Sequence, residues 1–466
     1  MRRWLERAFA LRERGTTLRT EVVAGATTFF AMAYIVVVQP AVLSGAMLGR
    51  ETGMPAGAVM TATCLSAALA TALMGLWARA PIAQAPGMGE NFFFVLTVLP
   101  AAAAAGYTNA WQVGLGVVFA SGVLFLALTL AGVRRHLVDA IPPGLHAGIG
   151  VGIGLFVAFI GLQNAGLVVK DPATAVRLET NWLSPNLLVF FTGLLVASAL
   201  EVRRVRGALV LGMASSAALA FALRAVRPLV GAEGPAWTAL ERLAVPDSLV
   251  SLPPSVSPTL FALDLGGAVS PAMLPFVLVF LLMVLFDTIG TLVGVTEGLG
   301  LESKGALPHP DRAYLSDAVA TVGGAVLGTS TVTSFIESAA GVEQGGRTGL
   351  TALVVAALFV LALFFSPLVS ALGAYPPITA PALVVVGAAM LRSAERIPWR
   401  DPGESIPAFL IAIGIPLSYS ISDGLAVGLV AYPVLQCLAG RARTLRWPLV
   451  ATAAVLLVYL VALRSS

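Results

Sequence analysis

The residues best suited to chemistry lie in one polar stretch, 328–341, of a chain that is otherwise apolar almost throughout. Small hydroxylated and β-branched residues lead there into an acid, Glu337. In lipid, a carboxylate and non-helical backbone are tolerated only where protein or a water-filled cavity shields them. The stretch therefore predicts an interrupted membrane span that lines a site at membrane depth, which is typical of a transporter.

The spacing of Ser334 and Glu337 also fits a second interpretation. It matches a capping box, in which the serine would cap a helix and the glutamate would reach back to the serine's backbone. We favour a ligand role for Glu337, because an acid within the membrane is usually functional.

A second acid, Asp287, lies in the long apolar run 275–294. Insertion scales put the cost of an aspartate at a span centre at about 2.5–3.5 kcal/mol. A carboxyl group whose pKa is set by burial and by hydrogen-bond donors is able to load and release a proton. The alternative is a structural carboxylate bonded to Thr291, one turn further on.

The segment 81–95 predicts a second interruption, because its prolines and glycines forbid a continuous helix through 81–89. We expect a short extended piece and then a half-helix that starts near Glu90, followed by the polar Asn91. The alternating residues 329–334 suit another short strand, with a half-helix from Phe335. The two extended pieces would pair, and both half-helix N-termini would face a common centre.

Composition places these residues in a polytopic helical membrane protein. Of 466 residues, 58% are hydrophobic and 11% are charged, against about 25% charged in soluble domains. The net charge of +4 comes from basic residues in short loops, so no nucleic-acid partner is expected. The two cysteines lie in apolar runs and predict no disulfide framework. Fourteen candidate spans can be placed, near 21–43, 57–77, 84–99, 110–132, 144–168, 186–201, 207–224, 272–296, 313–328, 330–343, 349–366, 378–391, 405–420 and 424–440.

The loop charges give this layout an orientation. With residues 1–20 as a cytoplasmic amphipathic segment, alternation through fourteen spans leaves most of the 28 Lys and Arg residues inside. The exceptions are Arg50, Lys170, Arg177, Arg224, Arg227, Arg242 and Arg464. This excess satisfies the positive-inside rule and predicts a multi-pass protein of the inner (plasma) membrane. The topology of 441–466 stays open, because the apolar run 447–463 is able to cross the membrane or to lie along it.

The connection 228–271, expected outside the cytoplasm, divides the chain into repeats at 21–227 and 272–440. Each repeat has seven spans with the interrupted one third, so the second enters from the opposite side. Such an inverted repeat, with interrupted spans at matching places, indicates a transporter site. The predicted fold class is thus an all-α membrane protein with a 7+7 inverted repeat and two broken spans, at segments 3 and 10.

Several motifs resemble one known family, the AzgA-like adenine/guanine/hypoxanthine permeases of the nucleobase–cation symporter-2 (xanthine/uracil permease) family. They are TTFFAMAYI (27–35), GMGEN (87–91), GLFVAFIGLQN (154–164), FDTIGTL (286–292), TVTSFIESAAG (331–341) and EQGGRTG (343–349). The resemblance covers nearly the whole chain.

The resemblance implies a core of spans 1–4 and 8–11, a gate of spans 5–7 and 12–14, and proton-coupled uptake of a purine base, often by a homodimer. It also implies site residues. Glu337 would grip the base edge, Asp287 would be the acid of span 8, and Asn91 would be the polar residue of the first half-helix. Phe92 and Phe335 would line the site, and we add Ser334 and Tyr34 as further candidates for substrate binding. Asp287, Glu337 and Thr291 are the candidates for proton coupling.

Two departures from the family pattern bear on which base fits. Gln39 stands where the branch usually has asparagine before proline, and Glu90 adds a carboxylate beside Asn91. We expect no cofactor and no metal, and sodium is not excluded as the coupling ion. The alternatives are a uracil or xanthine transporter of the same fold and an anion exchanger, which would be expected to carry a basic residue at the second half-helix. The sequence lacks the signature motifs of an intramembrane enzyme, which argues against that class. Saturable proton-driven flux would argue against a channel.

Overall fold

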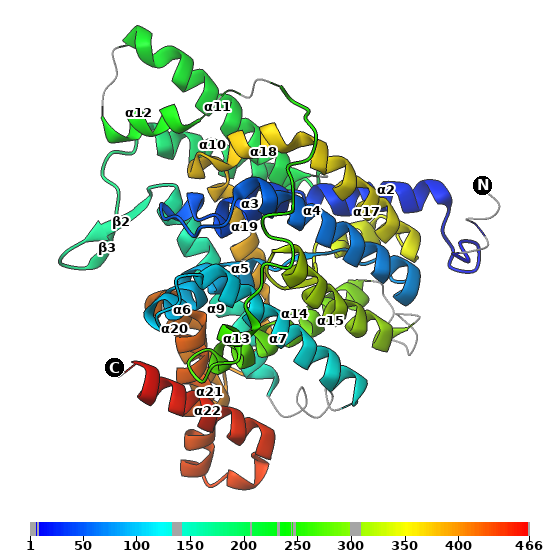
Figure 1. The fold of residues 1–466 in the computed structure, drawn as a ribbon, viewed down its shortest axis with the longest axis vertical. Coiled ribbons are helices and arrows are strands. Elements are labelled where there is room, and N and C mark those ends of the chain that lie inside the picture. Colours follow the sequence, from blue (N-terminus) through cyan, green and yellow to red (C-terminus); the bar gives the residue numbers. More distant parts are fainter. Residues whose placement is uncertain are drawn as a thin grey trace. The chain divides into compact units, whose positions relative to one another are not determined.

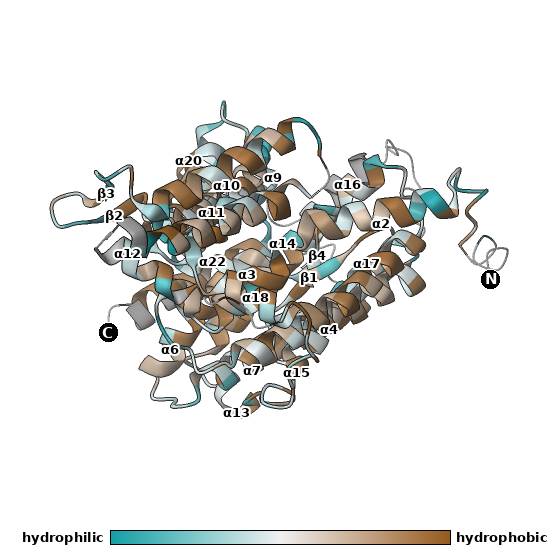
Figure 2. Cartoon of the chain, turned by 90° about the horizontal axis from the view of Figure 1, so that it is seen from above, coloured by the Kyte–Doolittle hydropathy of each residue, from teal (hydrophilic) through white to brown (hydrophobic). Residues whose placement is uncertain are grey.

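The computed structural model describes residues 6, 9–132, 142–205, 207–230, 234–243, 245, 248–298 and 309–464. The predicted inside cations Arg2, Arg3, Arg7, Arg134, Arg135, Arg206 and Lys304 lie outside the described residues. Helices make up most of the described chain (Figure 1), and their ribbons are largely hydrophobic (Figure 2).

The helices follow the predicted spans closely. In the first half they are α2 (Leu18–Met32), α3 (Ile35–Leu43), α4 (Ala56–Leu73), α5 (Met88–Phe93), α6 (Leu99–Ala104), α7 (Ala110–Leu130), α9 (Pro143–Asn164), α10 (Pro185–Val202) and α11 (Ala208–Val230). In the second half they are α14 (Leu274–Gly298), α15 (Pro310–Leu327), α16 (Ser338–Glu343), α17 (Gly349–Ala362), α18 (Ser366–Gly373), α19 (Ala380–Met390), α20 (Pro402–Ser418), α21 (Ile421–Leu438) and α22 (Trp447–Arg464). Two short helices, α12 (Pro235–Ala239) and α13 (Leu265–Ala268), interrupt the long connection.

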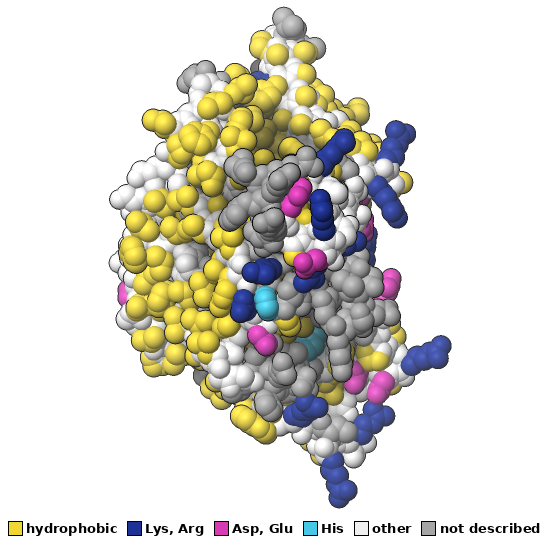
Figure 3. All heavy atoms as spheres, turned by 90° about the vertical axis from the view of Figure 1, so that its right-hand side faces the viewer, with side chains coloured by type: hydrophobic (Ala, Val, Ile, Leu, Met, Phe, Trp, Pro, Cys, Tyr) yellow, Lys and Arg dark blue, Asp and Glu magenta, His cyan; other side chains and the backbone are white. Residues whose placement is uncertain are grey.

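Among the described residues, nine helices are long and apolar enough to cross a membrane. Shorter apolar helices cover Met88–Ala104, Pro402–Ser418 and Trp447–Val458. The uncertain C-terminal run is thus helical. Figure 3 shows a broad hydrophobic surface on the face drawn there, and Lys and Arg side chains beside it. The architecture is that of a polytopic helical membrane protein.

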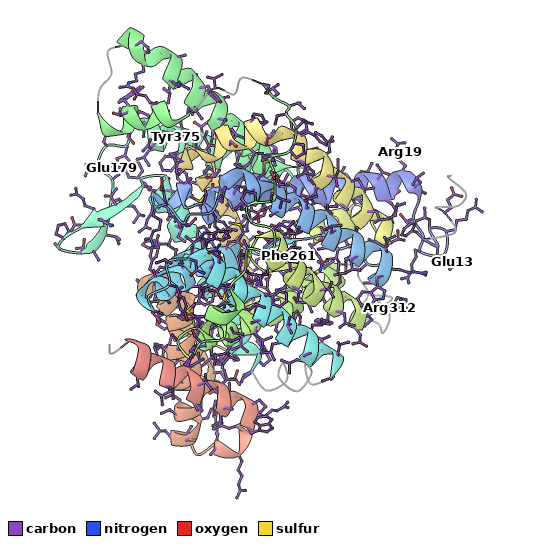
Figure 4. The ribbon with its side chains drawn as sticks, in the orientation of Figure 1. Glu13, Arg19, Glu179, Phe261, Arg312 and Tyr375 are labelled. Carbon is purple, nitrogen blue, oxygen red and sulfur yellow. The ribbon has the colours of Figure 1, made fainter. Side chains whose placement is uncertain are left out.

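The chain divides into two compact units. The first contains Met1–Gly87, Ile160–Ala262 and Asp287–Val385, and the second contains Met88–Phe159, Leu263–Phe286 and Val386–Ser466. In the first unit, Arg19 and Arg312 lie toward one end, and Glu179 and Tyr375 lie toward the other (Figure 4). Predicted inside and outside positions of this unit are therefore separated in space.

Two pairs of short strands complete the fold. β1 (Gln84–Pro86) pairs antiparallel with β4 (Val332–Ser334), and the register sets Gln84 opposite Ser334. The pairing of these two pieces was predicted from the sequence. α16 begins at Ser338, however, and not near Phe335 as predicted, because a turn intervenes at 336–337.

The second strand pair is a hairpin that the sequence reasoning missed. β2 (Val168–Asp171) pairs with β3 (Ala175–Leu178) in a segment predicted as a loop. Asp171 accepts hydrogen bonds from the backbone N–H groups of Ala173 (2.8 Å) and Thr174 (3.0 Å). These bonds, with the charge of Arg177, hold the pKa of Asp171 below its usual value.

A glycine ends α15, so that the chain can leave the helix and become extended before β4. Gly328 has φ of 97° and donates its N–H to Gly324 at the end of the helix. This left-handed conformation favours glycine. A Cβ atom here would also lie 2.1 Å from the Thr259 Cβ. Both constraints fix where the helix stops and the extended segment starts.

Candidate functional site

The candidate site in the first unit is built around the β1–β4 strand pair. Beyond the three register pairs, Phe335 donates its N–H to Ala83 (2.9 Å) and Gly87 donates its N–H to Thr331 (3.1 Å). The backbone groups of two segments far apart in the sequence thus satisfy one another. This mutual satisfaction is important inside an apolar protein, because each unsatisfied buried backbone group costs roughly several kcal/mol.

Glu337 lies three residues after the end of β4 and directly precedes α16. Its Oε1 atom accepts a hydrogen bond from the Tyr34 hydroxyl at 2.9 Å, across 303 residues of sequence. Tyr34 is buried at the turn between α2 and α3, and Glu337 is half-buried. The structure therefore brings together two of the predicted site residues.

The capping-box interpretation is wrong. Glu337 itself occupies the N-cap position of α16, and no side chain caps that helix. The Ser334 hydroxyl instead donates to Asp317 Oδ1 at 2.8 Å. The serine lies within β4, so it is one turn too early to cap α16.

A further acid, Asp317 of α15, contacts both strands, and it was not among the predicted site residues. It is fully buried and accepts from the Thr288 hydroxyl (2.6 Å), the Ser334 hydroxyl and the Ser334 N–H (3.2 Å). The Gln84 side-chain amide also donates to it. Ser316 donates to Gln84 Oε1 at 3.0 Å, which holds that amide in place. Asp317 therefore joins β1, β4 and α14.

One rule could have found Asp317. The predicted span 313–328 contains this single acid, and the reasoning applied to Asp287 holds for it as well. The signal was weaker, because Asp317 lies near the start of the predicted span and not at its centre.

Gln39, one of the departures from the family pattern, contacts the strand entry. Its side-chain amide donates to Thr329 Oγ1 (2.9 Å) and Ser330 Oγ (3.3 Å), and all three residues are buried. Pro40 lies next to it inside α3. The first span is thus tied to the segment that leads into β4.

Asp287 and Thr291 share α14, where Asp287 is half-buried and Thr291 is 5% exposed. Phe335 is buried beside β4. These three candidates belong to the same unit as Glu337.

Asn91 and Phe92 belong to the second unit and are described within it. Both are buried in α5, where the Asn91 amide lies 3.9 Å from the Met88 sulfur. The Phe92 ring packs edge-on against Phe156, which packs edge-on against Tyr419. Their roles in a binding site stay predictions, as does the common centre for the two half-helices.

Fold and buried polar groups together define the class of the protein. Two short strands pair between apolar helices, and buried acids lie beside them, which is typical of a membrane transporter. A search of protein families finds the permease family, which covers xanthine and uracil permeases, over residues 19–427. The chain belongs to this family.

Related proteins match over nearly their full lengths. A putative permease of Methanocaldococcus jannaschii is 42% identical over 446 residues (96% of this chain, 95% of the relative). The guanine/hypoxanthine permease PbuO of Bacillus subtilis is 42% identical (96% and 98%). The adenine permease AdeP of Escherichia coli is 40% identical (95% and 92%).

Solved structures support the fold. The transmembrane domain of the cyanobacterial bicarbonate transporter BicA matches with a TM-score of 0.60 at 14% identity, over 86% of this chain and 96% of that domain. The murine Solute Carrier 26 family member A9 anion transporter, in its inward-facing state, matches with a TM-score of 0.59 at 11% identity (91% and 69%). At such identities the likeness concerns the fold.

Proposed function

We propose that this permease imports purine nucleobases, namely adenine, guanine or hypoxanthine, by proton symport with alternating access. The observation that carries the proposal is the hydrogen bond from the buried Tyr34 to the half-buried Glu337, beside the β1–β4 strands. It is supported by relatives named as guanine/hypoxanthine and adenine permeases, which match at 40–42% identity over 95% or more of this chain.

The chemistry of a purine suits an acid at this place. A purine is flat and uncharged, with N–H donors along its edge. A carboxylate accepts such donors, and a hydrogen bond to a charged group contributes roughly 1.5–3 kcal/mol. The Tyr34 hydroxyl holds the Glu337 carboxylate in one orientation, and Phe335 supplies an aromatic surface for a base. Ser334 and Asp287 complete the proposed first-unit set.

For the coupling ion, we propose that Asp287 and Glu337 carry the proton, assisted by Thr291. Asp287 lies on α14 next to Thr288, whose hydroxyl binds Asp317 beside β4, so it belongs to the element that contacts the strand pair preceding Glu337. Sodium remains the alternative coupling ion.

We further propose fourteen spans in two inverted repeats of seven, with broken spans at β1–α5 and β4–α16. Each strand is continued along the chain by a short helix, and Gly87 and the turn at 336–337 provide the breaks. The plasma membrane, a cytoplasmic N-terminus and a homodimer belong to the same proposal.

The alternatives differ in their substrates. The fold likeness to anion transporters would suit an exchanger, but no Lys or Arg occurs between Gly328 and Gly346, where an anion would need one. A uracil or xanthine transporter is separated from the proposal only by measured specificity.

Uptake into proteoliposomes tests the proposal. Labelled adenine, guanine, hypoxanthine and uracil are offered with an imposed pH gradient, with and without a protonophore. We expect saturable accumulation of at least one of the three purines that the protonophore abolishes. Accumulation of uracil alone, or uptake that requires bicarbonate or another anion, would contradict the proposal.

A further inference from the structure

A second buried carboxylate, Glu21, lies outside the proposed binding set. It belongs to the first turn of α2 and is fully buried. Its Oε1 atom accepts from the Arg347 N–H at 2.9 Å. Its Oε2 atom accepts from the Thr348 hydroxyl (2.8 Å), the Thr351 N–H (3.1 Å) and the Thr351 hydroxyl (2.7 Å). One acid thus binds four donors of the turn 347–351.

These donors form the N-terminus of α17, for which Thr348 is the N-cap residue. The first N–H groups of a helix lack partners within it, and its positive dipole end attracts a carboxylate. Glu21 supplies that carboxylate from another helix, 326 to 330 residues away. It therefore joins α2 to α17.

Arg347 carries the connection on to α16. Its N–H is bound by Glu21, and its guanidinium donates to the carbonyls of Val342 (2.6 Å) and Gly346 (2.9 Å). Val342 lies in the last turn of α16, so the clamp reaches the end of that helix. The six residues of α16 span only about 9 Å, and Glu337 precedes them.

Close packing leaves α2 and α16 little freedom to slide. A Cβ atom on Gly341 would lie 2.2 Å from the Thr28 hydroxyl, and one on Gly25 would lie 2.7 Å from the Thr351 carbonyl. The backbones of α2, α16 and α17 are therefore in near contact. The segment 21–34, which contains most of α2, is thus joined to the segment 337–351 at both ends. Glu21 binds Arg347 at one end, and Tyr34 binds Glu337 at the other.

We propose that Glu21 is a positioning residue for substrate binding. By clamping the turn 347–351 onto α2, it holds α16 in register and so fixes Glu337 against Tyr34. The inference rests on the proposed function, because the affinity it controls is that for a purine.

The test compares purine affinity with folding stability in purified full-length protein. The variant E21Q keeps the size of the side chain but replaces one accepting oxygen with an amide N–H₂ group, which faces the donors of 347–351 and cannot accept from them. The variant T351V removes only the hydroxyl donor of Thr351. T17A is the matched control. Thr17 caps the start of α2 through Thr20 and is exposed, so its loss weakens the same helix end without touching 347–351.

For E21Q we expect Kd and KM for the transported purine to rise by about fivefold or more, which is a typical size for coupling between sites. T351V should show a smaller rise, and T17A should lower Tm with unchanged Kd. In a double-mutant cycle, E21Q and Y34F should be non-additive in Kd, because both act on the orientation of Glu337.

Wild-type Kd in E21Q with a lowered Tm, as in T17A, would overturn the proposal, and so would full additivity with Y34F. If E21Q does not fold, the comparison of T351V with T17A tests the proposal instead. A wild-type Kd with a lowered Tm in T351V would then overturn it. Lack of purine binding by the wild-type protein would count against the proposed function, whereas equal binding by wild type and variants would count against the role of Glu21.

Discussion

At the scale of single residues, the protein places acids among apolar helices and gives each of them hydrogen-bond donors. Glu337 accepts from Tyr34, Asp317 accepts from three side chains and a backbone N–H, and Glu21 accepts from 347–351. Asp317 and Glu21 are bound by several donors, which suits groups that hold neighbouring elements in place. Glu337 and Asp287 are half-buried, which suits groups that exchange ligands or protons.

The variant D287N should separate proton coupling from substrate binding. An amide cannot take up and release a proton at physiological pH, so proton-driven accumulation should fall to the level without a gradient. Exchange of external for internal purine needs no net proton movement and should persist. Both assays are run on the same proteoliposomes, with expression and Tm as checks. Unchanged accumulation would show that Asp287 is structural.

At the scale of elements, the β1–β4 strand pair organises the residues around Glu337 and Asp317. The sequence predicted the strand pair well, because prolines at 81 and 86 and the alternation in 329–334 are local signals. It placed the start of α16 three residues too early, since the turn at 336–337 has no such signal. The contacts of Asp317 and Glu21 could not be predicted from the sequence, because their partners are brought to them only by tertiary packing.

Gly328 offers a test of the element boundary. G328A forces a Cβ atom into a left-handed conformation and toward Thr259, so Tm should fall by several degrees, corresponding to roughly 1–2 kcal/mol or more. The matched control is G323A in the same helix, where a Cβ atom meets nothing within 4 Å. That control should leave Tm unchanged or raise it, because alanine favours helix. Equal Tm for G328A and G323A would contradict the boundary argument.

At the scale of the whole molecule, the hydrophobic spans and their loop charges were readable from the sequence, and the helix bounds agree with them. What a sequence alone could not give was the hairpin at 168–178, whose short strands are flanked by charged residues and lack a hydrophobic pattern. The orientation in the membrane remains a prediction from the positive-inside rule.

Single-cysteine labelling tests that orientation. In a background in which Cys64 and Cys437 are replaced, E179C should react with a membrane-impermeant thiol reagent in intact cells. R19C should react only after the cells are permeabilised. The two positions lie toward opposite ends of the first unit (Figure 4), so one experiment reports both sides. Labelling of R19C in intact cells, with E179C protected, would invert the proposed topology.

The most direct measurement is equilibrium binding of a labelled purine to purified E337Q, beside wild type and E343Q. Glu343 is an exposed acid six residues further along and controls for loss of charge on the same helix. We predict that E337Q loses binding by at least about tenfold, the loss expected for one hydrogen bond to a charged group, while E343Q binds like wild type. Wild-type affinity in a folded E337Q protein would contradict the assignment of Glu337 as the residue that binds the base.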